Sequence, residues 1–489
     1  MPLARHLVAI VVLAGVGSTG SAAVPTVPPP SEATGTTAES DWPGFGRDPG
    51  RSNSSTAATG IDAGNVASLR RQQVRLDGTV DASPIYLRGV RVKGQLHDVF
   101  FVTTTYGKTV AIDANDGAIL WEYTPQAYES WAGSYRITTA TPVAGPSREF
   151  IYAASPDGHI QKLEVADGHL VWSTAITKLP EREKIAAALN FFEGRVIVAT
   201  GGYIGDRPPY QGHVAILDGA SGRLLHVWNA LCGDRAELIE PRSCPASGAA
   251  IWGRSGAVVD TASGDIFVAT GNGRWNGRTD WGDAAIELDR DATRLVGNYT
   301  PSNTEELDAG DRDLGSTSPA LLGGGLIAQG GKDGRIRLLS VDRMRGSAAH
   351  RGGEVQSVST PSGGDLFTAP AVLHDKTGTW LFAADNGGTA AWALQSGRLE
   401  QKWQNSRAGT SPVIAGGLLY VYDPSGGLRV YRPDTGHQIA TLDCGEGHWN
   451  SPIVVDGKIA LPEGNANAHR TSGVLDIWRL LQSPLVDRR

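Results

Sequence analysis

The sequence has few cysteines, no excess of positive charge and none of the common catalytic motifs, and each shortage excludes a class of function. The three cysteines form no C-x-x-C-H motif, so no c-type haem is expected on this chain. With 44 Lys and Arg against 51 Asp and Glu, the net charge is −7, and the chain has no electrostatic reason to bind nucleic acid. The motifs G-x-S-x-G, H-E-x-x-H and the P-loop are also absent, so the sequence gives no support to the reactions they serve.

The first residues have the pattern of a secretory signal peptide rather than of a membrane anchor. Arg5 and His6 precede an apolar run over residues 7–16, and small residues ending in Ala22 and Ala23 follow. A membrane span needs about 20 apolar residues, so this run is too short and no membrane span is expected. No cysteine lies near the cleavage site, so no lipid anchor is expected either. We therefore predict a signal peptide over residues 1–23, a disordered Pro/Thr/Ser-rich tether over 24–40, and a secreted or periplasmic protein.

Glycine and tryptophan are abundant, and they recur in a repeat. The chain has 63 Gly and 13 Trp but two Met, which favours short strands and tight turns over helical packing. Residues 111–121 read A-x-D-A-x-x-G-x-x-x-W, and related segments end in Trp172 and Trp403. Each unit opens with a Pro-containing strand and continues through Asp-Gly or Gly-Gly turns that suit two-residue hairpins. A unit of this kind predicts four antiparallel strands, which make one propeller blade, with the Trp side chains packed between blades.

Counting the opening strands gives eight blades in one all-β domain over residues 41–489. The last unit lacks an outer strand of its own, and the segment 65–76 has no blade, so this N-terminal segment is expected to supply that strand. The predicted fold is an eight-bladed β-propeller of four-stranded antiparallel blades, closed into a ring by an N-terminal strand so that no sheet edge is exposed. The blades are expected to open near Ala82, Thr139, Ala187, Ser255, Thr317, Thr368, Thr410 and Asn450.

The cysteines agree with export. Cys232 and Cys244 bracket a short polar segment and are expected to form a disulfide in an oxidising compartment; two unpaired thiols are the alternative. Cys444 is left over. No residue near it in the sequence is arranged as an activating base, so we expect a structural role rather than that of a nucleophile.

The repeat at residues 111–121 resembles the tryptophan-docking repeat of the pyrroloquinoline quinone (PQQ) propeller superfamily. That superfamily includes quinoprotein alcohol dehydrogenases and the outer-membrane assembly propeller, and the resemblance spans roughly residues 42–480. Because both enzymes and non-enzymes use this repeat, the resemblance implies the fold more strongly than any function. In such a propeller the long insertions 201–212, 271–282 and 462–473 lie on one face, called here the loop-rich face, where binding is expected.

Residues 251–288 resemble the stretch of quinoprotein alcohol dehydrogenases that builds half of their active site. The resemblance implies that Trp252 is the floor on which the quinone stacks, and that Asn272 and Asp283 are ligands of a calcium ion. It also implies that Asp283 is the catalytic base and that Lys332 binds the quinone oxygens. If these roles apply, the cofactors are PQQ and calcium.

Three departures from that pattern argue for an incomplete site. The insertion 201–212 has no Glu to serve as a calcium ligand, only Asp206. The segment 130–142, which would carry a vicinal cysteine pair over the quinone, has no cysteine. Ala284 stands where an Asn normally follows the catalytic Asp. Without a bound metal the quinone carbonyl is not polarised, and a base alone does little.

The sequence leaves open whether the chain is an enzyme. The incomplete site favours a binding scaffold whose loop-rich face holds a protein, a glycan or a small ligand. The alternative is a PQQ- and calcium-dependent alcohol dehydrogenase, which would pass electrons to a separate acceptor because no haem is expected on the chain. A second alternative is an outer-membrane protein assembly propeller.

Overall fold

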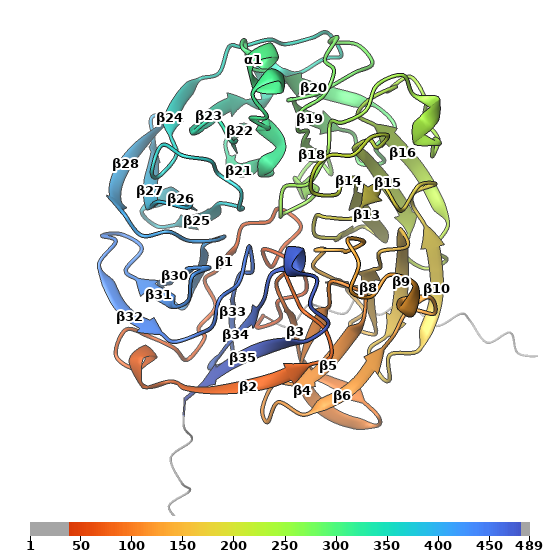
Figure 1. Cartoon of the computed structure of the whole chain (residues 1–489). Helices are drawn as coiled ribbons and strands as arrows, with labels where there is room; N and C mark the ends of the chain where they lie inside the picture. Colours follow the sequence, from red (N-terminus) through yellow and green to blue (C-terminus); the bar gives the residue numbers. More distant parts are fainter. Residues whose placement is uncertain (1–38, 481–489) are drawn as a thin grey trace, which may run out of the picture. The chain divides into compact units, whose positions relative to one another are not determined.

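The computed structural model describes residues 39–480 as one ring of eight four-stranded sheets (Figure 1). The all-β, eight-bladed prediction is therefore confirmed. The predicted signal peptide and almost all of the predicted tether lie outside the described residues. Within residues 39–480, no helix is both long and apolar enough to cross a bilayer.

Each of the first four blades is an antiparallel sheet whose strands follow one another in chain order, innermost strand first, with β14 outside the sheet of blade 3. Blade 1 contains β3 (Ile85–Val92), β4 (Gln95–Thr103), β5 (Thr109–Asp113) and β6 (Ile119–Tyr123). Blade 2 contains β7 (Val143–Ala144), β8 (Phe150–Ala154), β9 (His159–Glu164) and β10 (Leu170–Ala175). Blade 3 contains β12 (Asn190–Phe192), β13 (Arg195–Ala199), β15 (His213–Asp218) and β16 (Leu224–Asn229). Blade 4 contains β17 (Val258–Val259), β18 (Ile266–Ala269), β19 (Ala285–Leu288) and β20 (Leu295–Tyr299).

The remaining blades follow the same plan, except that the last takes its outer strand from the N-terminal part of the chain. Blade 5 contains β21 (Ala320–Gly323), β22 (Leu326–Gly330), β23 (Arg335–Ser340) and β24 (Gln356–Ser359). Blade 6 contains β25 (Ala371–Asp375), β26 (Gly378–Ala384), β27 (Thr389–Gln395) and β28 (Arg398–Asn405). Blade 7 contains β29 (Val413–Ala415), β30 (Leu418–Tyr422), β31 (Leu428–Tyr431) and β32 (Gln438–Leu442). Blade 8 contains β33 (Ile453–Val455), β34 (Lys458–Glu463), β35 (Gly473–Arg479) and β2 (Arg70–Leu76).

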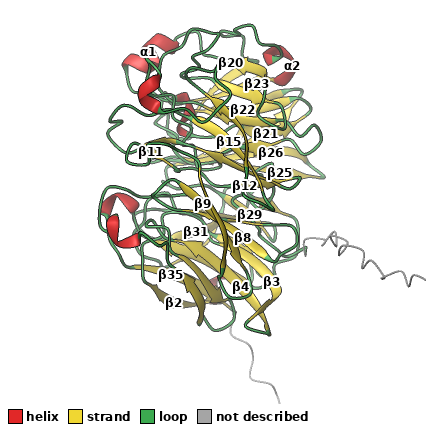
Figure 2. Ribbon diagram, turned by 90° about the vertical axis from the view of Figure 1, so that its right-hand side faces the viewer, coloured by secondary structure: helices red, strands yellow, loops and turns green. Residues whose placement is uncertain are grey.

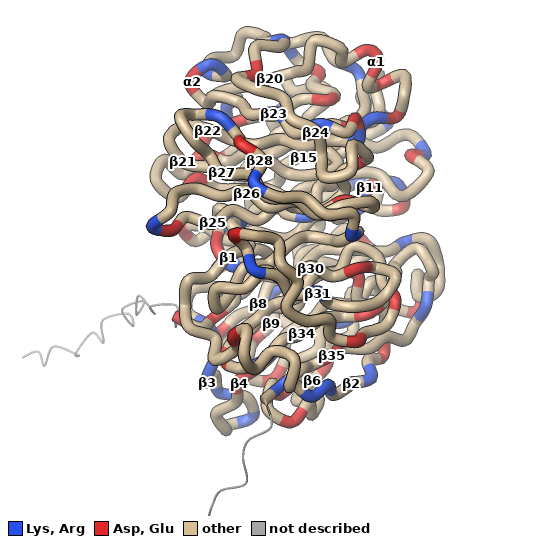
Figure 3. Tube along the Cα trace, turned by 90° about the vertical axis from the view of Figure 1, so that its left-hand side faces the viewer, with Lys and Arg blue, Asp and Glu red and all other residues tan. Residues whose placement is uncertain are grey.

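Short elements decorate the ring. A two-stranded ribbon joins β11 (Glu183–Lys184) to β14 (Gly201–Gly202). The α-helices of the described chain are α1 (Thr304–Ala309) and α2 (Val341–Met344), which lie toward opposite faces in the edge-on view of Figure 2. Short 3₁₀ turns are η1 (Val66–Ser68), η2 (Tyr128–Ser130), η3 (Pro241–Ser243), η4 (Leu314–Ser316) and η5 (Ala466–Ala468). Acidic and basic residues are interspersed along the edge seen in Figure 3.

The N-terminal strand closes the ring, as predicted from the segment 65–76. Strand β2 pairs antiparallel with β35 along its whole length, from Arg70 opposite Arg479 to Leu76 opposite Gly473. Arg71 Nε donates to Asp476 Oδ1 over 2.7 Å, and Asp476 is fully buried. Burial and the adjacent Glu463 carboxyl raise the pKa of Asp476 to about 7, although Arg71 opposes this effect. Because Arg71 of β2 pairs with both Glu463 and Asp476, side-chain contacts as well as backbone hydrogen bonds join the closing strand to blade 8.

The repeated tryptophans lock one blade to the next, which explains the sequence motif. Trp121 on β6 donates from Nε1 to the carbonyl of Val165 in blade 2 over 2.9 Å. A methyl group added to Gly168, in the turn before β10, would lie 2.6 Å from the Trp121 ring. In the same way, a methyl group added to Gly222 would lie 2.5 Å from the Trp172 ring, and one added to Gly436 would lie 2.6 Å from the Trp403 ring. The predicted inter-blade packing of these tryptophans is confirmed.

Hydroxyl groups at the blade openings form a second set of inter-blade links, near the axis of the ring. Thr139 Oγ1 donates to the carbonyl of Ala186 over 2.8 Å, and Thr317 Oγ1 donates to the carbonyl of Thr368 over 3.1 Å. Thr410 Oγ1 donates to the carbonyl of Asn450 over 2.6 Å. At these three openings, a threonine two or three residues before the opening proline therefore bonds to the opening of the following blade.

The segment before β2 crosses the middle of the ring, an arrangement that the sequence did not predict. Trp42 pairs with Tyr86 of blade 1, and the carbonyl of Pro49 accepts from Val259 of blade 4 over 2.9 Å. Strand β1 (Ser54–Ser55) then pairs parallel with β29 of blade 7. Figure 1 shows this red segment passing between the innermost strands. The segment therefore contributes to several blades before it becomes the closing strand.

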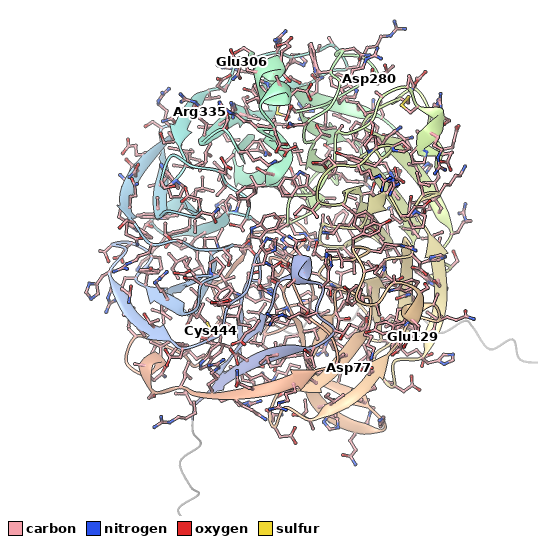
Figure 4. All side chains as sticks on the ribbon, in the orientation of Figure 1. Asp77, Glu129, Asp280, Glu306, Arg335 and Cys444 are labelled. Carbon is pink, nitrogen blue, oxygen red and sulfur yellow. A yellow bond between two sulfur atoms is a disulfide. The ribbon has the colours of Figure 1, made fainter. Side chains whose placement is uncertain are left out.

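The cysteines take the predicted arrangement. Cys232 and Cys244 form a disulfide with their Cα atoms 6.2 Å apart. Cys444 is free and half-buried, lies beside blades 7 and 8 (Figure 4), and accepts a hydrogen bond from the Gly427 N–H at 3.1 Å. Burial raises the pKa of the Cys444 thiol to about 12, which suits a structural thiol and not a nucleophile.

Candidate functional site

The four residues predicted for a quinone site come from three connections and meet at the loop-rich face. Trp252 precedes blade 4, Asn272 and Asp283 lie between β18 and β19, and Lys332 lies between β22 and β23. Asp313, which precedes η4, joins them: its Oδ1 accepts from the Asn272 N–H at 2.7 Å, and its Oδ2 forms an ion pair with Lys332. Lys332 Nζ also lies 5.5 Å from the centre of the Trp252 ring.

Asp283 is held in an environment that favours its protonated form. The side chain is fully buried, the residue has φ of 48°, and Oδ1 accepts from the Leu314 N–H at 2.9 Å. Burial raises the pKa of Asp283 to about 8, and the negative charges of Asp313 and Asp308 act in the same direction. The hydrogen bond from the Leu314 N–H and the charge of Lys332 lower the pKa, but by less. At neutral pH this carboxyl therefore carries its proton.

Two buried oxygen atoms at this point have no hydrogen-bond partner among residues 39–480. One is Oδ2 of Asp283 and the other is Oδ1 of Asn272. The amide nitrogen of Asn272 is engaged, since it donates to the Asp308 carbonyl at 3.3 Å. Buried polar atoms are rarely left without a partner, so these two oxygens mark the best-founded place for a bound group.

A calcium ion fits these residues only in part. Calcium takes six to eight oxygen ligands, and the two free oxygens of Asn272 and Asp283 supply two. Burial and the negative charges of Asp313 and Asp311 raise the pKa of Asp206, which places it beside the same acidic group, but its Oδ1 already accepts from the Tyr210 hydroxyl at 2.9 Å. In the described part of the chain, no set of three or more His, Cys, Asp or Glu side chains is arranged to hold a metal. The ligand itself would have to complete the cage.

Trp252 belongs to an aromatic cluster that the sequence predicted only in part. Its ring lies 5.7 Å from that of Trp449 at an interplanar angle of 30°, and Phe367 lies 5.3 Å from Trp449 at 17°. Phe367 and Trp449 also line a pocket of 220 Å³ between the openings of blades 6, 7 and 8, together with His448 and Asn386. Of these residues only Trp252 was predicted for a site, and Phe367 and Asn386 carry no signal in the sequence.

A buried ion-pair cluster lies directly behind the aromatic rings and was not predicted. Arg254 Nη2 donates to Asp81 Oδ1 at 2.6 Å, His448 Nδ1 is bonded to Asp81 Oδ2 at 2.8 Å, and the Arg254 guanidinium lies 5.0 Å from the centre of the Trp449 ring. Burial and the nearby charge of Arg254 together lower the pKa of Lys184 to about 8, and Asp81 opposes them only in part. Lys184 has no hydrogen-bond or ion-pair partner in the described chain, so it is a free cation close to the mouth.

The segment 130–142, which has no cysteine where the resemblance would place a vicinal pair, contributes to an aromatic cluster. Trp131 is buried and donates from Nε1 to the Tyr106 carbonyl at 3.0 Å. It packs in a cluster with Tyr106, Tyr128, Ile137 and Tyr203, which come from the loops of blades 1 to 3.

Comparison with known proteins supports the fold of this chain but does not establish its activity. Quinohemoprotein alcohol dehydrogenase ADH IIB of Pseudomonas putida is 28% identical over 231 residues, which are 44% of this chain and 32% of that protein. The structure of quinohemoprotein alcohol dehydrogenase from Comamonas testosteroni matches with a TM-score of 0.66 at 16% identity, covering 92% of this chain and 82% of that one. BamB from Moraxella catarrhalis matches with a TM-score of 0.51 at 14% identity, covering 85% and 98% of the two chains. At these identities the structural likeness shows the fold alone.

The sequence match covers about a third of the length of the Pseudomonas enzyme, so that enzyme's activity does not pass to this chain by similarity. More than half of the chain, residues 79–347, matches a PQQ-repeat family model described as outer membrane protein assembly factor BamB. The resemblance stated from residues 111–121 is thereby confirmed, and the chain belongs to this PQQ-repeat propeller family.

Proposed function

We propose that this chain is an exported propeller that binds a small, flat ligand of the quinone type at the mouth of its loop-rich face. Among the ligand classes that the sequence leaves open, a small molecule suits the site better than a protein or glycan. The groups that could bind it converge on one pocket-sized region instead of being spread over the rim.

The observation that carries the proposal is the aromatic cluster of Trp252, Phe367 and Trp449, in which Phe367 and Trp449 line a 220 Å³ pocket and Trp252 lies against Trp449. Half-buried aromatic rings with charged groups at their edges suit a flat ligand that carries an acidic substituent. The cations of this region are Lys332, which lies 5.5 Å from the Trp252 ring centre and is ion-paired with Asp313, and Lys184, which has no partner among residues 39–480.

Titration of the purified protein with PQQ, in the presence and absence of Ca²⁺, tests the proposal. We expect a 1:1 complex and about tenfold weaker binding after Trp252→Ala, because one stacking contact is worth about 1 kcal/mol beyond its buried area. Trp380→Ala is the matched control, since Trp380 stacks on Phe382 of its own blade, 6.1 Å away, and is not part of the aromatic cluster that borders the pocket. Failure to bind PQQ under both conditions, or equal weakening by the two variants, contradicts the proposal.

A second candidate, a PQQ- and calcium-dependent alcohol dehydrogenase, is favoured by the two buried oxygens without partners. Asn272 Oδ1 and Asp283 Oδ2 are hard ligands of the kind Ca²⁺ prefers. When bound, the quinone with its metal would supply the hydride acceptor. The chain itself would offer Trp252 as a stacking surface, Lys332 as a cation at the quinone oxygens, and Asp283 as a proton acceptor once it is ionised.

Binding of Ca²⁺ distinguishes the second candidate from the first. Because Asp283 has a pKa of about 8, a cation that binds its carboxylate at pH 7 must release a proton. We expect this release in calorimetry in two buffers of different ionisation enthalpy, with loss of the release in Asp283→Asn, and dye reduction with alcohols. Tight PQQ binding that needs no Ca²⁺ and supports no dye reduction would contradict the second candidate and support only the binding role.

Export is part of the proposal and has its own test. It is supported by the signal-peptide pattern of residues 1–23 and by the Cys232–Cys244 disulfide, which suits an oxidising compartment. Expression of the full chain in a bacterium should give a processed protein outside the cytoplasm, beginning near residue 24. Retention of the unprocessed chain in the cytoplasm would contradict it.

A further inference from the structure

His448 differs from the other polar residues of the aromatic pocket because one of its ring nitrogens is free. Its Nδ1 is bonded to Asp81 Oδ2 at 2.8 Å, and its ring stacks on Trp449 with centroids 4.1 Å apart. Its Nε2 has no hydrogen-bond partner among residues 39–480. Since His448 lines the pocket, this nitrogen is available to a ligand there.

Asp81 fixes which nitrogen carries the proton. Its carboxylate is fully buried and is held by Arg254 at 2.6 Å and by the Ala466 N–H at 3.0 Å. Burial alone would raise the pKa of Asp81, but Arg254 and the bond from His448 outweigh burial and hold the pKa well below its usual range. A carboxylate that stays ionised accepts the Nδ1 proton, so the neutral ring presents Nε2 as a hydrogen-bond acceptor.

The other polar side chains around the pocket are largely occupied. The Asp385 carboxylate accepts from the backbone N–H groups of Ser362, Gly387 and Gly388 at 2.7 to 2.8 Å. The hydroxyls of Thr368 and Thr410 donate to the backbone carbonyls of Ala384 and Asn450. Asn386 is exposed and the ring nitrogen of Trp449 is only a donor. His448 Nε2 is therefore the acceptor that a ligand in this pocket meets against the aromatic wall.

We propose that the pocket takes a single flat ring bearing a hydroxyl group, and that His448 Nε2 accepts the hydroxyl hydrogen while Asp81 acts as its positioning residue. The volume of 220 Å³ lies below the roughly 300–1,000 Å³ of pockets for drug-sized ligands, so the pocket is expected to hold one ring of a flat ligand and not the whole of a multi-ring molecule. Phe367 and Trp449, 5.3 Å apart at 17°, supply the stacking surface. The inference rests on the proposed small-ligand function, since it names the chemical group that the same mouth recognises.

The test compares phenol with toluene, two rings of similar size of which only one donates a hydrogen bond. With histidine-selective ¹⁵N labelling, His448 is expected in the Nδ1-protonated form, and phenol is expected to shift its Nε2 resonance where toluene does not. In His448→Phe, which keeps an aromatic ring against Trp449, the preference for phenol over toluene should fall about tenfold, the effect of one lost hydrogen bond. His97→Phe is the matched control, because His97 forms a similar 2.6 Å pair with Asp113 but is not part of the pocket.

Asp81→Asn adds a readout that a merely structural role would not give. If that variant folds, the tautomer of His448 should move toward the Nε2-protonated form and the phenol preference should fall as in His448→Phe. The inference is overturned if phenol and toluene shift His448 equally, if His448→Phe keeps the preference, or if neither ring binds. Because phenol and PQQ are titrated separately, failure of this inference is distinguishable from failure of the proposed quinone-type ligand.

Discussion

Asp283 shows at the scale of one residue how burial sets a protonation state and leaves it open to change. In the unfolded chain this carboxyl ionises near its ordinary pKa of 3.8, and in the fold its pKa is about 8. Between these values the folded state binds more protons than the unfolded state, so the free energy of unfolding falls as the pH rises from 4 to 8.

Asp283→Asn should therefore stabilise the fold in alkaline solution. Asparagine is close in shape to the protonated acid and does not titrate, so the variant should match the native chain near pH 4. It should exceed the native chain near pH 8 by on the order of 2 kcal/mol or more, measured by denaturant unfolding at both pH values. Asp311→Asn is the control, since the Asp311 side chain is 75% exposed and its ion pair is worth at most about 1 kcal/mol. A constant difference between variant and native chain across this range would contradict the argument.

For Lys184 the free energy of unfolding changes with pH in the direction opposite to that for Asp283. The pKa of Lys184 is lowered from its ordinary 10.5 to about 8, so the fold bears the cost of a half-buried charge below pH 8. Between pH 8 and 10.5 the unfolded chain binds more protons, and stability rises with pH as this cost disappears. Lys184→Met should therefore unfold at higher denaturant than the native chain at pH 7, by about 1–2 kcal/mol, with a smaller gain at pH 10.

The exposed Lys178, whose substitution Lys178→Met should change stability little at either pH, is the control. Equal stability of Lys184→Met and the native chain at pH 7 would show that the Lys184 charge is solvated. Because PQQ carries acidic groups, Lys184→Met should also bind PQQ more weakly, although its free energy of unfolding is higher than that of the native chain.

The sequence pointed to candidate site residues in neighbouring blades and missed those that pair across the ring. The resemblance to quinoprotein alcohol dehydrogenases implied Trp252, Asn272, Asp283 and Lys332, which belong to the connections of blades 4 and 5. Asp81, Arg254 and His448 open blades 1, 4 and 8, and they meet only because the ring closes. Nothing in the spacing of these three residues along the chain indicates that contact.

At the scale of the element, a turn and a tryptophan form the unit that joins blades. The Gly168 turn has φ of 77° and lies against the Trp121 ring, at 2.6 Å from an added methyl group. The equivalent Gly397 turn of blade 6 has φ of 72° and nothing within 4 Å. Comparison of the two glycines separates backbone strain from tryptophan packing.

Gly168→Ala and Gly397→Ala should therefore differ in stability. Both introduce a side chain at positive φ, which costs about 1–2 kcal/mol. Gly168→Ala must also displace the Trp121 ring, which adds about 1–3 kcal/mol of overpacking. Denaturant unfolding of the two variants measures the difference. Equal losses in the free energy of unfolding would mean that the Trp121 ring moves aside without destabilising the fold.

The same comparison explains which elements could be predicted. The blades follow from the Gly and Trp positions because each repeat needs the same turn and the same packing contact. The crossing segment before β2 has no such repeat. It is held by single backbone bonds such as that from Val372 to the Ser52 carbonyl at 2.8 Å, and such bonds leave no periodic pattern in a sequence.

At the scale of the whole molecule, closure decides whether the ring has free edges. Without β2, strand β35 would expose the backbone groups that now pair with residues 70–76. It would also uncover Leu475, Ile477 and Trp478, which are buried in the clusters beside β2. A sheet edge with apolar side chains beside it is a site of association between chains.

Truncation from the N-terminus tests closure in steps. A chain that begins at residue 39 keeps every described contact and should be monomeric in size-exclusion chromatography. A chain that begins at residue 57 loses the crossing segment and β1 but keeps β2, so it should be less stable and still monomeric. A chain that begins at residue 77 loses β2 and should associate, because β35 then pairs with another chain. Association of the chain beginning at residue 57 would instead assign the closing role to the crossing segment, and a monomeric chain beginning at residue 77 would show that seven complete blades and a three-stranded eighth suffice.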